Sequence, residues 1–396
     1  MKILQLCNRV PFPPLDGGSL AICNLTKAFI DAGHSISMAV LDPSGRDTSV
    51  GKKYHGLASF YSVPVDTSVH VSGAIRTLLT GKSYNVTRFI SREFTRLLKE
   101  VLVRENPDVV QVEGLYMSPY IETIRENSSA KIVLRTHNVE HRIWKQMSGA
   151  AFPGLKKIYL GILARRLKVY EEDRLNLSDA IIPITPLDEV ALRELGCRVP
   201  MHTAAFGINV AEYIPSGIMD IPSVFHLGAM DWKPNAEGVK WFLEKVWPDV
   251  HSRMPGLKLH LGGKGMPSGL LKKAPPGVVV TGAIADARQY MASRQIMIVP
   301  LLSGGGMRVK IIEGMAMGKA IISTPVGCEG ISCTPGKDIL VAATPAELAE
   351  KIIHCASNPD FCLAIGKNAR TLAENEYNNR LIAARLLGFY EKLISR

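Results

Sequence analysis

The sequence predicts an α/β protein made of two doubly wound parallel-sheet domains, and three observations support this. Strand-like apolar runs alternate with helix-like runs along the chain, which is typical of parallel sheets. The alternation comes as two series, separated by a turn-rich connection at 196–222. The length of 396 residues also exceeds the range in which a single hydrophobic core keeps growing.

The first series begins at the N-terminus with the apolar run MKILQL. A loop rich in Pro and Gly follows, and it leads into a helix expected near 20–32. Further short apolar runs, several of them ending in polar residues, predict the remaining strands of this series at 35–41, 107–114, 130–138 and 178–185.

The second series predicts a helix at 236–247 and strands at 223–230, 257–263, 277–282 and 296–301. A last helix, from about 379 to 394, is apolar on one face and is expected to pack back on the first domain. We therefore predict three parts: a domain at 1–205, a domain at 206–378, and a C-terminal helix at 379–396. In doubly wound sheets, ligands bind at the carboxyl ends of the strands.

The composition is that of a soluble enzyme, with 46% hydrophobic and 21% charged residues. The net charge of +11 is spread over both halves of the chain, whereas a nucleic-acid-binding protein would show a denser basic stripe. No apolar run is long enough to span a membrane, and the chain starts with a strand instead of a signal peptide, so a cytoplasmic location is expected. The seven cysteines show no metal-binding spacing and are expected to be reduced and mostly buried.

The densest basic segment lies between Arg135 and Lys168, where eight cations face one acid, Glu140. Within it, Leu155–Tyr170 sets apolar residues, Leu163 among them, near helical spacing beside Lys and Arg. One interpretation is peripheral contact with an anionic membrane at its inner face. The other is an ordinary surface helix, and the sequence leaves both open.

The most informative segment is 300–331, where an apolar strand leads into Gly304–Gly306 and then a helix. The glycine turn brings backbone N–H groups close to a ligand, and the helix N-terminus adds partial positive charge. Arg308 and Lys310 add full charges, while Glu313 can accept hydrogen bonds from paired hydroxyls such as those of a ribose. This pattern predicts a nucleotide diphosphate site; the alternative is a glycine-rich turn before a solvated helix.

Several segments together resemble one family. The glycine turn, the run EGMAMGKAIIST and the following VGCEG resemble the donor site of GT-B fold retaining glycosyltransferases of family 4, of the bacterial cell-surface polysaccharide or glycolipid type. Similar resemblances cover 16–34, 135–144 and 227–242. The resemblance implies two Rossmann-like domains facing a central cleft, with the acceptor bound by the N-terminal domain and the nucleotide sugar by the C-terminal one.

The resemblance also assigns roles to residues of the donor site. Glu313 matches the second Glu of the family's E-x7-E motif and is implied to bind the ribose, but the first Glu is replaced by Gly305. Backbone N–H groups of Gly305 and Gly306 are then expected to bind sugar hydroxyls or phosphate, and Arg308 and Lys310 to bind the diphosphate. The other residues implied on the donor side are Gly17 and Gly18, Gly304, Lys233, Ile284 and Glu329.

On the acceptor side, His137 ends a predicted strand and is implied to lie near the donor sugar, where it could hydrogen-bond a sugar oxygen or help move a proton. Asn138, Glu140 and Glu113 are weaker candidates of the same kind. Near 281–286, Asp286 is either a nucleotide-side residue or simply the cap of the next helix. His137, Arg308 and Lys310 are therefore the predicted catalytic residues.

The activity implied is transfer of a sugar from a UDP- or GDP-sugar to a hydroxyl of a glycan or lipid-linked acceptor, with retention at the anomeric carbon. No carboxylate pair of the glycosidase kind stands out, so front-face attack is expected, and no metal cofactor is expected. Polysaccharide or lipopolysaccharide synthesis would fit such an enzyme. The alternatives are a sugar-nucleotide epimerase, a synthase of the glycogen or sucrose type, and a nucleotide-sugar-binding protein without transfer activity.

Overall fold

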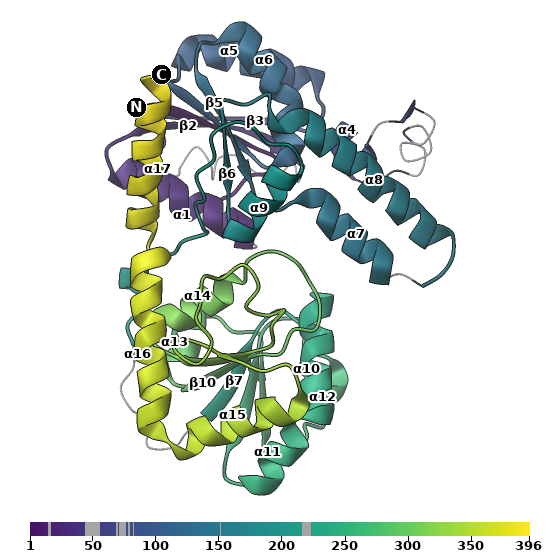
Figure 1. Cartoon of the computed structure of the whole chain (residues 1–396), viewed down its shortest axis with the longest axis vertical. Helices are drawn as coiled ribbons and strands as arrows, with labels where there is room; N and C mark the ends of the chain where they lie inside the picture. The colour runs from purple at the N-terminus through teal and green to yellow at the C-terminus, as the bar shows by residue number, and fades with distance from the viewer. Residues whose placement is uncertain are drawn as a thin grey trace. The chain divides into compact units, whose positions relative to one another are not determined.

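The computed structural model describes residues 1–14, 17–43, 56–68, 70, 77, 80–81, 83–150, 152–215 and 223–396. The chain divides into two compact units (Figure 1). Unit 1 is Met1–Phe206 with Ile382–Arg396, and unit 2 is Gly207–Leu381. Part of the turn-rich connection, 216–222, lies outside the described residues.

Unit 1 contains a six-stranded parallel sheet in the order β3-β2-β1-β4-β5-β6. This is the doubly wound order, in which the connections reverse direction between β1 and β4 and leave a ligand-binding crevice at the carboxyl ends of those two strands. The strands are β1 (Lys2–Cys7), β2 (Ser35–Asp42), β3 (Ser59–Pro64), β4 (Val109–Glu113), β5 (Lys131–Thr136) and β6 (Ala180–Pro183).

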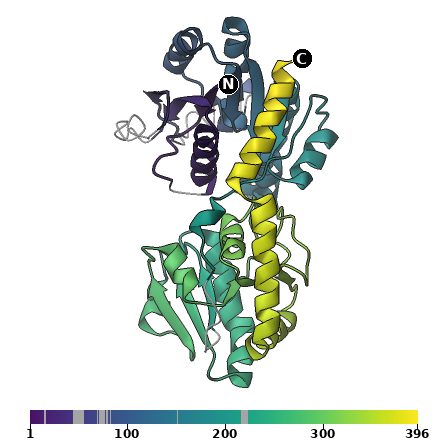
Figure 2. The same cartoon turned by 90° about the vertical axis from the view of Figure 1, so that its left-hand side faces the viewer.

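Helices cover both faces of this sheet because the strands are apolar on both faces. The C-terminal helix α17 packs here beside α1 (Figure 2). Its residues Ile382 and Leu386 share an apolar cluster with Leu25 and Phe29 of α1. The helices of unit 1 are α1 (Gly17–Asp31), α4 (Tyr84–Thr87), α5 (Arg92–Glu105), the 3-10 turn η1 (Leu115–Tyr120), α6 (Ile121–Asn127), α7 (Glu140–Ala150), α8 (Leu155–Leu175), α9 (Pro186–Glu194) and α17 (Asn379–Ile394).

Unit 2 repeats the same topology, with a parallel sheet in the order β12-β11-β10-β7-β8-β9. Its connections reverse between β7 and β10, so the loops after these two strands flank the crevice of this unit. The strands are β7 (Ser223–Leu227), β8 (Lys258–Gly262), β9 (Val278–Gly282), β10 (Ile296–Val299), β11 (Ala320–Ser323) and β12 (Leu340–Val341).

A glycine fixes how closely the first helix of unit 2 approaches the crevice. A Cβ at Gly238 of α10 would lie 2.3 Å from the carbonyl oxygen of Pro300, so only glycine lets α10 pack on the loop after β10. The helices of unit 2 are η2 (Val210–Glu212), α10 (Lys233–Lys245), α11 (Trp247–Arg253), α12 (Ser268–Lys272), α13 (Ala287–Ala292), α14 (Val309–Ala316), α15 (Pro345–Ser357) and α16 (Pro359–Glu376).

The predicted α/β fold with parallel sheets is confirmed, but three strands were not predicted from the sequence: β3, β11 and β12. The helix predicted at 236–247 ends earlier, because the chain breaks at Val246 and restarts as α11 with a proline in its first turn. Of the apolar residues noted at near-helical spacing in 155–170, Leu163 is buried, whereas Leu155 and Ile158 are exposed. No helix in the described part of the chain is long and apolar enough to cross a membrane.

Candidate functional site

The glycine turn of unit 2 follows β10 at the point where the sheet topology reverses. Gly304 and Gly306 have φ values of +112° and +79°, which favour glycine. A Cβ at Gly304 would lie 3.2 Å from Nη2 of Arg308 and 3.3 Å from the Trp232 ring. The turn therefore needs glycine both for its backbone conformation and for space.

Arg308, the residue before α14, holds this turn from inside. Its side chain is buried, and its Nη1 donates to the carbonyl oxygens of Gly305 and Gly306. Its guanidinium also lies 5.6 Å from the centre of the Trp232 ring. Among the described residues, its Nε and Nη2 find no hydrogen-bond partner, so three N–H groups on these two nitrogens remain for a ligand.

Lys310 lies two residues further along, in the first turn of α14, where Nζ donates to Oδ1 of Asn235 at 2.8 Å. Burial, with the charge of Arg308 adding to it, lowers the pKa of Lys310 to about 7. His226 of β7 is buried nearby and places Nδ1 3.0 Å from the carbonyl oxygen of Ile298. Burial and Lys310 hold the pKa of His226 well below its ordinary value, so this imidazole is neutral.

Arg308 and Lys310 thus bring two buried cationic side chains together at the end of the sheet, beside the neutral His226, without a paired carboxylate among the described residues. Within the described ranges no ion pair engages Arg308 or Lys310, although Glu329 lies near enough to raise the pKa of Arg308 against the effect of burial. Buried charges without partners are costly, because they lose hydration and gain nothing in return. Such an arrangement is typical of a site that binds an anion.

Glu313, one turn after Lys310 on α14, is held by Tyr213, whose hydroxyl donates to Oε1 at 2.8 Å. Burial raises the pKa of Glu313, and the hydrogen bond from Tyr213 opposes this shift. The tyrosine fixes the carboxyl group in one orientation and leaves Oε2 for another donor. This position suits the predicted binding of ribose hydroxyls.

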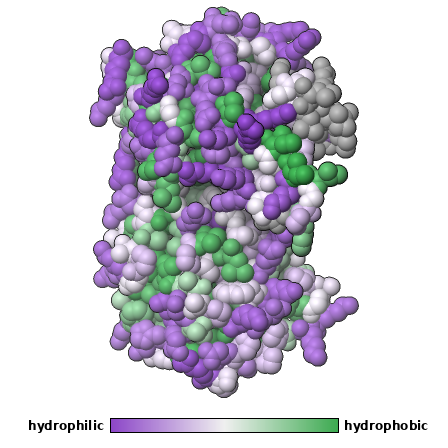
Figure 3. Space-filling view, turned by 45° about the vertical axis from the view of Figure 1, so that its right-hand side comes forward, coloured by the Kyte–Doolittle hydropathy of each residue, from purple (hydrophilic) through white to green (hydrophobic). Residues whose placement is uncertain are grey.

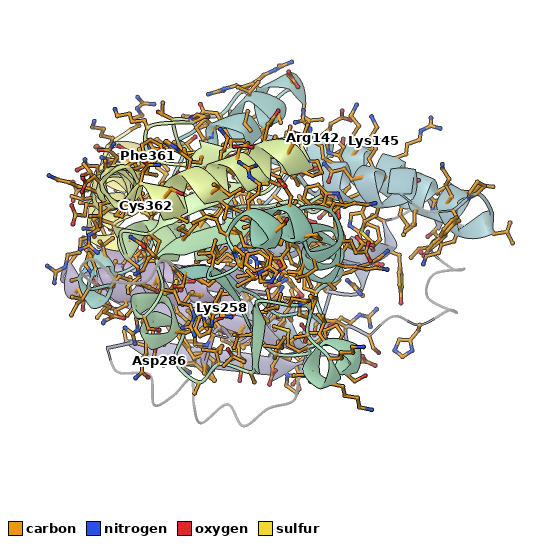
Figure 4. The ribbon with its side chains drawn as sticks, turned by 90° about the horizontal axis from the view of Figure 1, so that it is seen from below. Arg142, Lys145, Lys258, Asp286, Phe361 and Cys362 are labelled. Atoms are coloured by element: carbon orange, nitrogen blue, oxygen red, sulfur yellow. The ribbon has the colours of Figure 1, made fainter. Side chains whose placement is uncertain are left out.

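The remaining donor-side candidates lie at the edge of this cluster or outside it. Lys233 is 83% exposed and pairs with Glu237 at 3.4 Å, so its side chain does not join the buried cations. Ile284 packs against the end of β8 at Gly262, and Glu329 is exposed. Asp286, labelled in Figure 4, accepts hydrogen bonds from the N–H groups of the next helix and is therefore its cap.

In unit 1, Glu113 and His137 meet at the ends of β4 and β5. His137 Nε2 lies 2.6 Å from Oε2 of Glu113, and Nη1 of Arg135 lies 3.4 Å from the same oxygen. Burial opposes the ionisation of Glu113, but the charge of Arg135 and the hydrogen bond with His137 lower its pKa to about 2. Gln111 Nε2 also donates to Glu113, and Tyr390 of α17 donates to Gln111 at 2.7 Å.

This network fixes the orientation of His137. Because Glu113 is ionised and only accepts hydrogen bonds, Nε2 of His137 carries a proton and points inward. The ring packs edge-to-face against Phe206, with centroids 5.5 Å apart, and its side chain remains 20% exposed. Nδ1 is then the nitrogen that can meet a substrate.

Glu140, at the start of α7, is a second carboxyl group with a shifted pKa in unit 1. Burial raises its pKa to about 7, while hydrogen bonds from Tyr116, at 2.8 Å, and Asn138 oppose the shift. The N–H of Glu140 donates to Oε1 of Glu171 at 3.0 Å, which places two carboxyl groups close together. Gly17 and Gly18 begin α1, where the first N–H groups of a helix have no intrahelical partner.

The structure thus brings Gly304–Gly306, Arg308, Lys310 and Glu313 together in unit 2, and Glu113 and His137 together in unit 1, but it leaves Lys233 and Asp286 outside these two sets. It also adds residues that the sequence did not reveal. The sequence offers a weak signal for two of them, Trp232 and Asn235, because they flank a proline at the start of a helix. It offers none for the others, which are His226, Tyr213, Gln111 and Tyr390.

Comparison with known proteins supports the class of protein that the sequence resembles, the glycosyltransferases. Residues 221–358 match the family described as "Glycosyl transferases group 1". A protein of Klebsiella pneumoniae, "Uncharacterized 44.6 kDa protein in cps region", is 23% identical over 96% of this chain and 97% of its own.

Two solved structures are similar over nearly the whole chain. Sucrose-phosphate synthase from Thermosynechococcus elongatus has a TM-score of 0.74 at 16% identity, covering 100% of both chains. HepE of Anabaena, in complex with UDP, has a TM-score of 0.68 at 13% identity, covering 99% of this chain and 100% of its own. The chain therefore has the two-domain α/β fold of GT-B glycosyltransferases, and with the family match in unit 2 it is an enzyme of the glycosyltransferase type.

Proposed function

We propose that this enzyme transfers a sugar from a UDP- or GDP-sugar to a hydroxyl group of a glycan or lipid-linked acceptor, with retention at the anomeric carbon. The observation that carries the proposal is the buried pair of Arg308 and Lys310 beside the glycine turn of unit 2, which no ion pair engages among the described residues. The UDP bound in the HepE structure supports a nucleotide donor. The cps-region relative supports a role in polysaccharide synthesis.

In this proposal Arg308 and Lys310 bind the diphosphate and stabilise it as it leaves. Their interaction grows as negative charge develops on the leaving group, which is how preorganised cations lower a barrier. Glu313, oriented by Tyr213, binds the ribose. The backbone N–H groups of Gly305 and Gly306 take the place of the carboxylate that related enzymes direct at the donor sugar.

His137 would act on the acceptor side through Nδ1, hydrogen-bonding a sugar oxygen or the attacking hydroxyl. The departing diphosphate accepts the acceptor proton in a front-face attack, so no separate nucleophilic carboxylate is required. We expect no metal to be needed, because cations of the protein would replace it at the diphosphate. Within the described residues, no group of three His, Cys, Asp or Glu side chains could hold a metal ion.

A panel of UDP-, GDP-, ADP- and dTDP-sugars in a thermal-shift assay tests donor binding, because a ligand of the native state raises its stability by mass action. The best donor then goes into a transfer assay with glycan and lipid-linked acceptors, and the anomeric coupling constant in the product's NMR spectrum reports retention or inversion. An inverted product would refute the proposed stereochemistry. If no nucleotide sugar shifts the melting temperature, the assignment of the cation cluster is wrong.

Gly305 favours a second candidate, a nucleotide-sugar-binding protein without transfer activity. Replacing the usual carboxylate removes a side-chain contact to the donor sugar, while the diphosphate contacts stay intact. Donor binding without hydrolysis or transfer on any acceptor would support this alternative. Transfer to a single acceptor would exclude it.

A further inference from the structure

Helices α7 and α8 of unit 1 form a hairpin that projects from the sheet (Figure 1). Residues 152–154 lie at its tip. Helix α8 carries two apolar stripes. One stripe, which includes Leu160, Leu163 and Leu167, is buried. Successive residues of an α-helix are rotated by about 100° around its axis. The second stripe therefore lies on roughly the opposite side of α8 and faces outward.

This second stripe and the tip are unusually exposed for apolar residues. Phe152 is 93% exposed, Leu155 87% and Ile158 61%. Ile162 and Val169 continue the stripe along α8, and Met147 adds to it from α7. Figure 3 shows hydrophobic residues gathered in a projecting patch over this hairpin, at the upper right of that view. A contiguous exposed apolar surface of this kind marks a contact site.

Between the acidic residues at its base, the hairpin carries only positive charge. From His141 to Tyr170 the sequence contains seven Lys and Arg residues and no Asp or Glu. Three of these cations are engaged: Arg142 with Glu194, Lys168 with Glu172 and Arg166 with the carbonyl oxygen of Thr77. In the part of the chain that the structure describes, the other four have no ion-pair partner: Lys145, Lys156, Lys157 and Arg165. Arg142 and Lys145 lie one turn apart on α7 (Figure 4).

We propose that the tip of this hairpin docks on an anionic lipid bilayer. Phe152, Leu155 and Ile158 enter the boundary between headgroups and acyl chains, and Lys156, Lys157 and Arg165 contact anionic headgroups. A second copy of the chain is the less suitable occupant, because the four cations without an ion-pair partner among the described residues would meet the same four on the other copy. The inference does not depend on the proposed transfer reaction, but it fits a lipid-linked acceptor.

Co-sedimentation with liposomes tests this surface without any donor or acceptor. The wild-type protein should bind vesicles of phosphatidylcholine with about one third phosphatidylglycerol at low salt, and bind pure phosphatidylcholine vesicles much more weakly. Lys156→Gln/Lys157→Gln/Arg165→Gln should lower the partition coefficient at least about tenfold, since each cation near an anionic surface contributes measurably. Phe152→Ser/Leu155→Ser/Ile158→Ser should lower it by a similar factor through lost apolar burial.

A matched variant controls for net charge. Lys258→Gln/Lys272→Gln/Lys273→Gln removes three exposed lysines of unit 2 and should bind like the wild type. All four proteins should share one circular dichroism spectrum and melting temperature, because every substituted side chain is exposed. Three results would overturn the inference: wild-type protein that ignores anionic vesicles, equal losses in the control variant, or a lipid-free dimer that the Phe152→Ser triple variant converts to a monomer.

Discussion

Donor affinity should depend on pH through Lys310, and the size of the effect follows from its environment. The lysine is buried beside Arg308, which lowers its pKa to about 7 in the unliganded enzyme. A bound diphosphate favours the ammonium form and raises this pKa, so binding takes up a proton above neutral pH. Affinity is therefore fully present at pH 6 and is lost as the pH rises through 7.

With this pKa, Lys310 is about 90% charged at pH 6 and about 10% charged at pH 8. If only the ammonium form binds the diphosphate, the Kd for a nucleotide sugar should increase roughly tenfold over that interval. A nucleotide sugar is the right ligand, because its diphosphate has no titrating hydroxyl in this range. Isothermal titration calorimetry in two buffers of different ionisation enthalpy measures both the Kd and the proton uptake, which should approach about one proton at pH 8.

Two variants separate Lys310 from its neighbours. Lys310→Met should bind more weakly, with a Kd that stays constant between pH 6 and pH 8. Cys328 also needs a control, because a hydrogen bond from Cys333 lowers its pKa to about 7 close to Glu329. Cys328→Ser should keep the full pH dependence. A wild-type Kd that changes less than twofold, or a slope that persists in Lys310→Met, would show that the ammonium does not face the diphosphate.

Four further outcomes are expected. Arg308→Ala should lower kcat by roughly 10²- to 10³-fold, as loss of a preorganised donor at a developing charge does, and steady-state kinetics measure it. Glu313→Ala should mainly raise the KM for the donor, with Tyr213→Phe giving a smaller rise; wild-type kcat and KM in the Arg308, Lys310 and Glu313 variants together would mean that the site lies elsewhere. Transfer should persist in excess EDTA, and loss of activity that added Mg²⁺ or Mn²⁺ restores would contradict metal independence. Glu113→Ala should destabilise unit 1 by about 3–5 kcal/mol in chemical denaturation, because it leaves Arg135 buried without its partner. Glu113→Gln should be more stable than Glu113→Ala but should still have a lower kcat than the wild type. Equal stability of Glu113→Ala and wild type would rule out the buried pair.

The fold class could be predicted because its signal is local. Strands buried on both faces are continuous apolar runs, and β4, β5, β7 and β10 can be recognised without knowing their neighbours. Strand β11 is only four residues long and follows closely after the apolar helix α14. The apolar pattern therefore did not indicate a separate strand there. Strand β3 is half-exposed and lacks the continuous apolar signal.

The site could be predicted only where its residues are neighbours in the sequence. Gly304–Gly306, Arg308, Lys310 and Glu313 lie within one turn and the helix that follows it. The groups that orient them come from far away, since Asn235 is 75 residues from Lys310 and Tyr213 is 100 residues from Glu313. Residue spacing along the chain cannot show such pairs, because the order of the strands in the sheet creates them.

The proposed binding of the donor by unit 2 and of the acceptor by unit 1 came from the family resemblance, and a contrast between two crevices of the same topology supports it. At the β1–β4 crevice the buried charge is balanced, because Glu113 is satisfied by Arg135, His137 and Gln111. A balanced crevice gains nothing from a charged ligand, and it presents one hydrogen-bonding nitrogen of His137 to a neutral, hydroxyl-rich molecule.

At the β7–β10 crevice the balance is absent, since Arg308 and Lys310 have no carboxylate partner among the described residues and His226 is forced to stay neutral. Folding these cations together costs free energy that only an anionic ligand recovers. In our proposal, the same sheet order binds two different ligands because the buried charges of the two crevices differ. Removing one of the two buried cations tests this argument. Lys310→Met should raise the melting temperature of the unliganded protein and weaken nucleotide-sugar binding. An unliganded variant that is less stable than the wild type would contradict the argument.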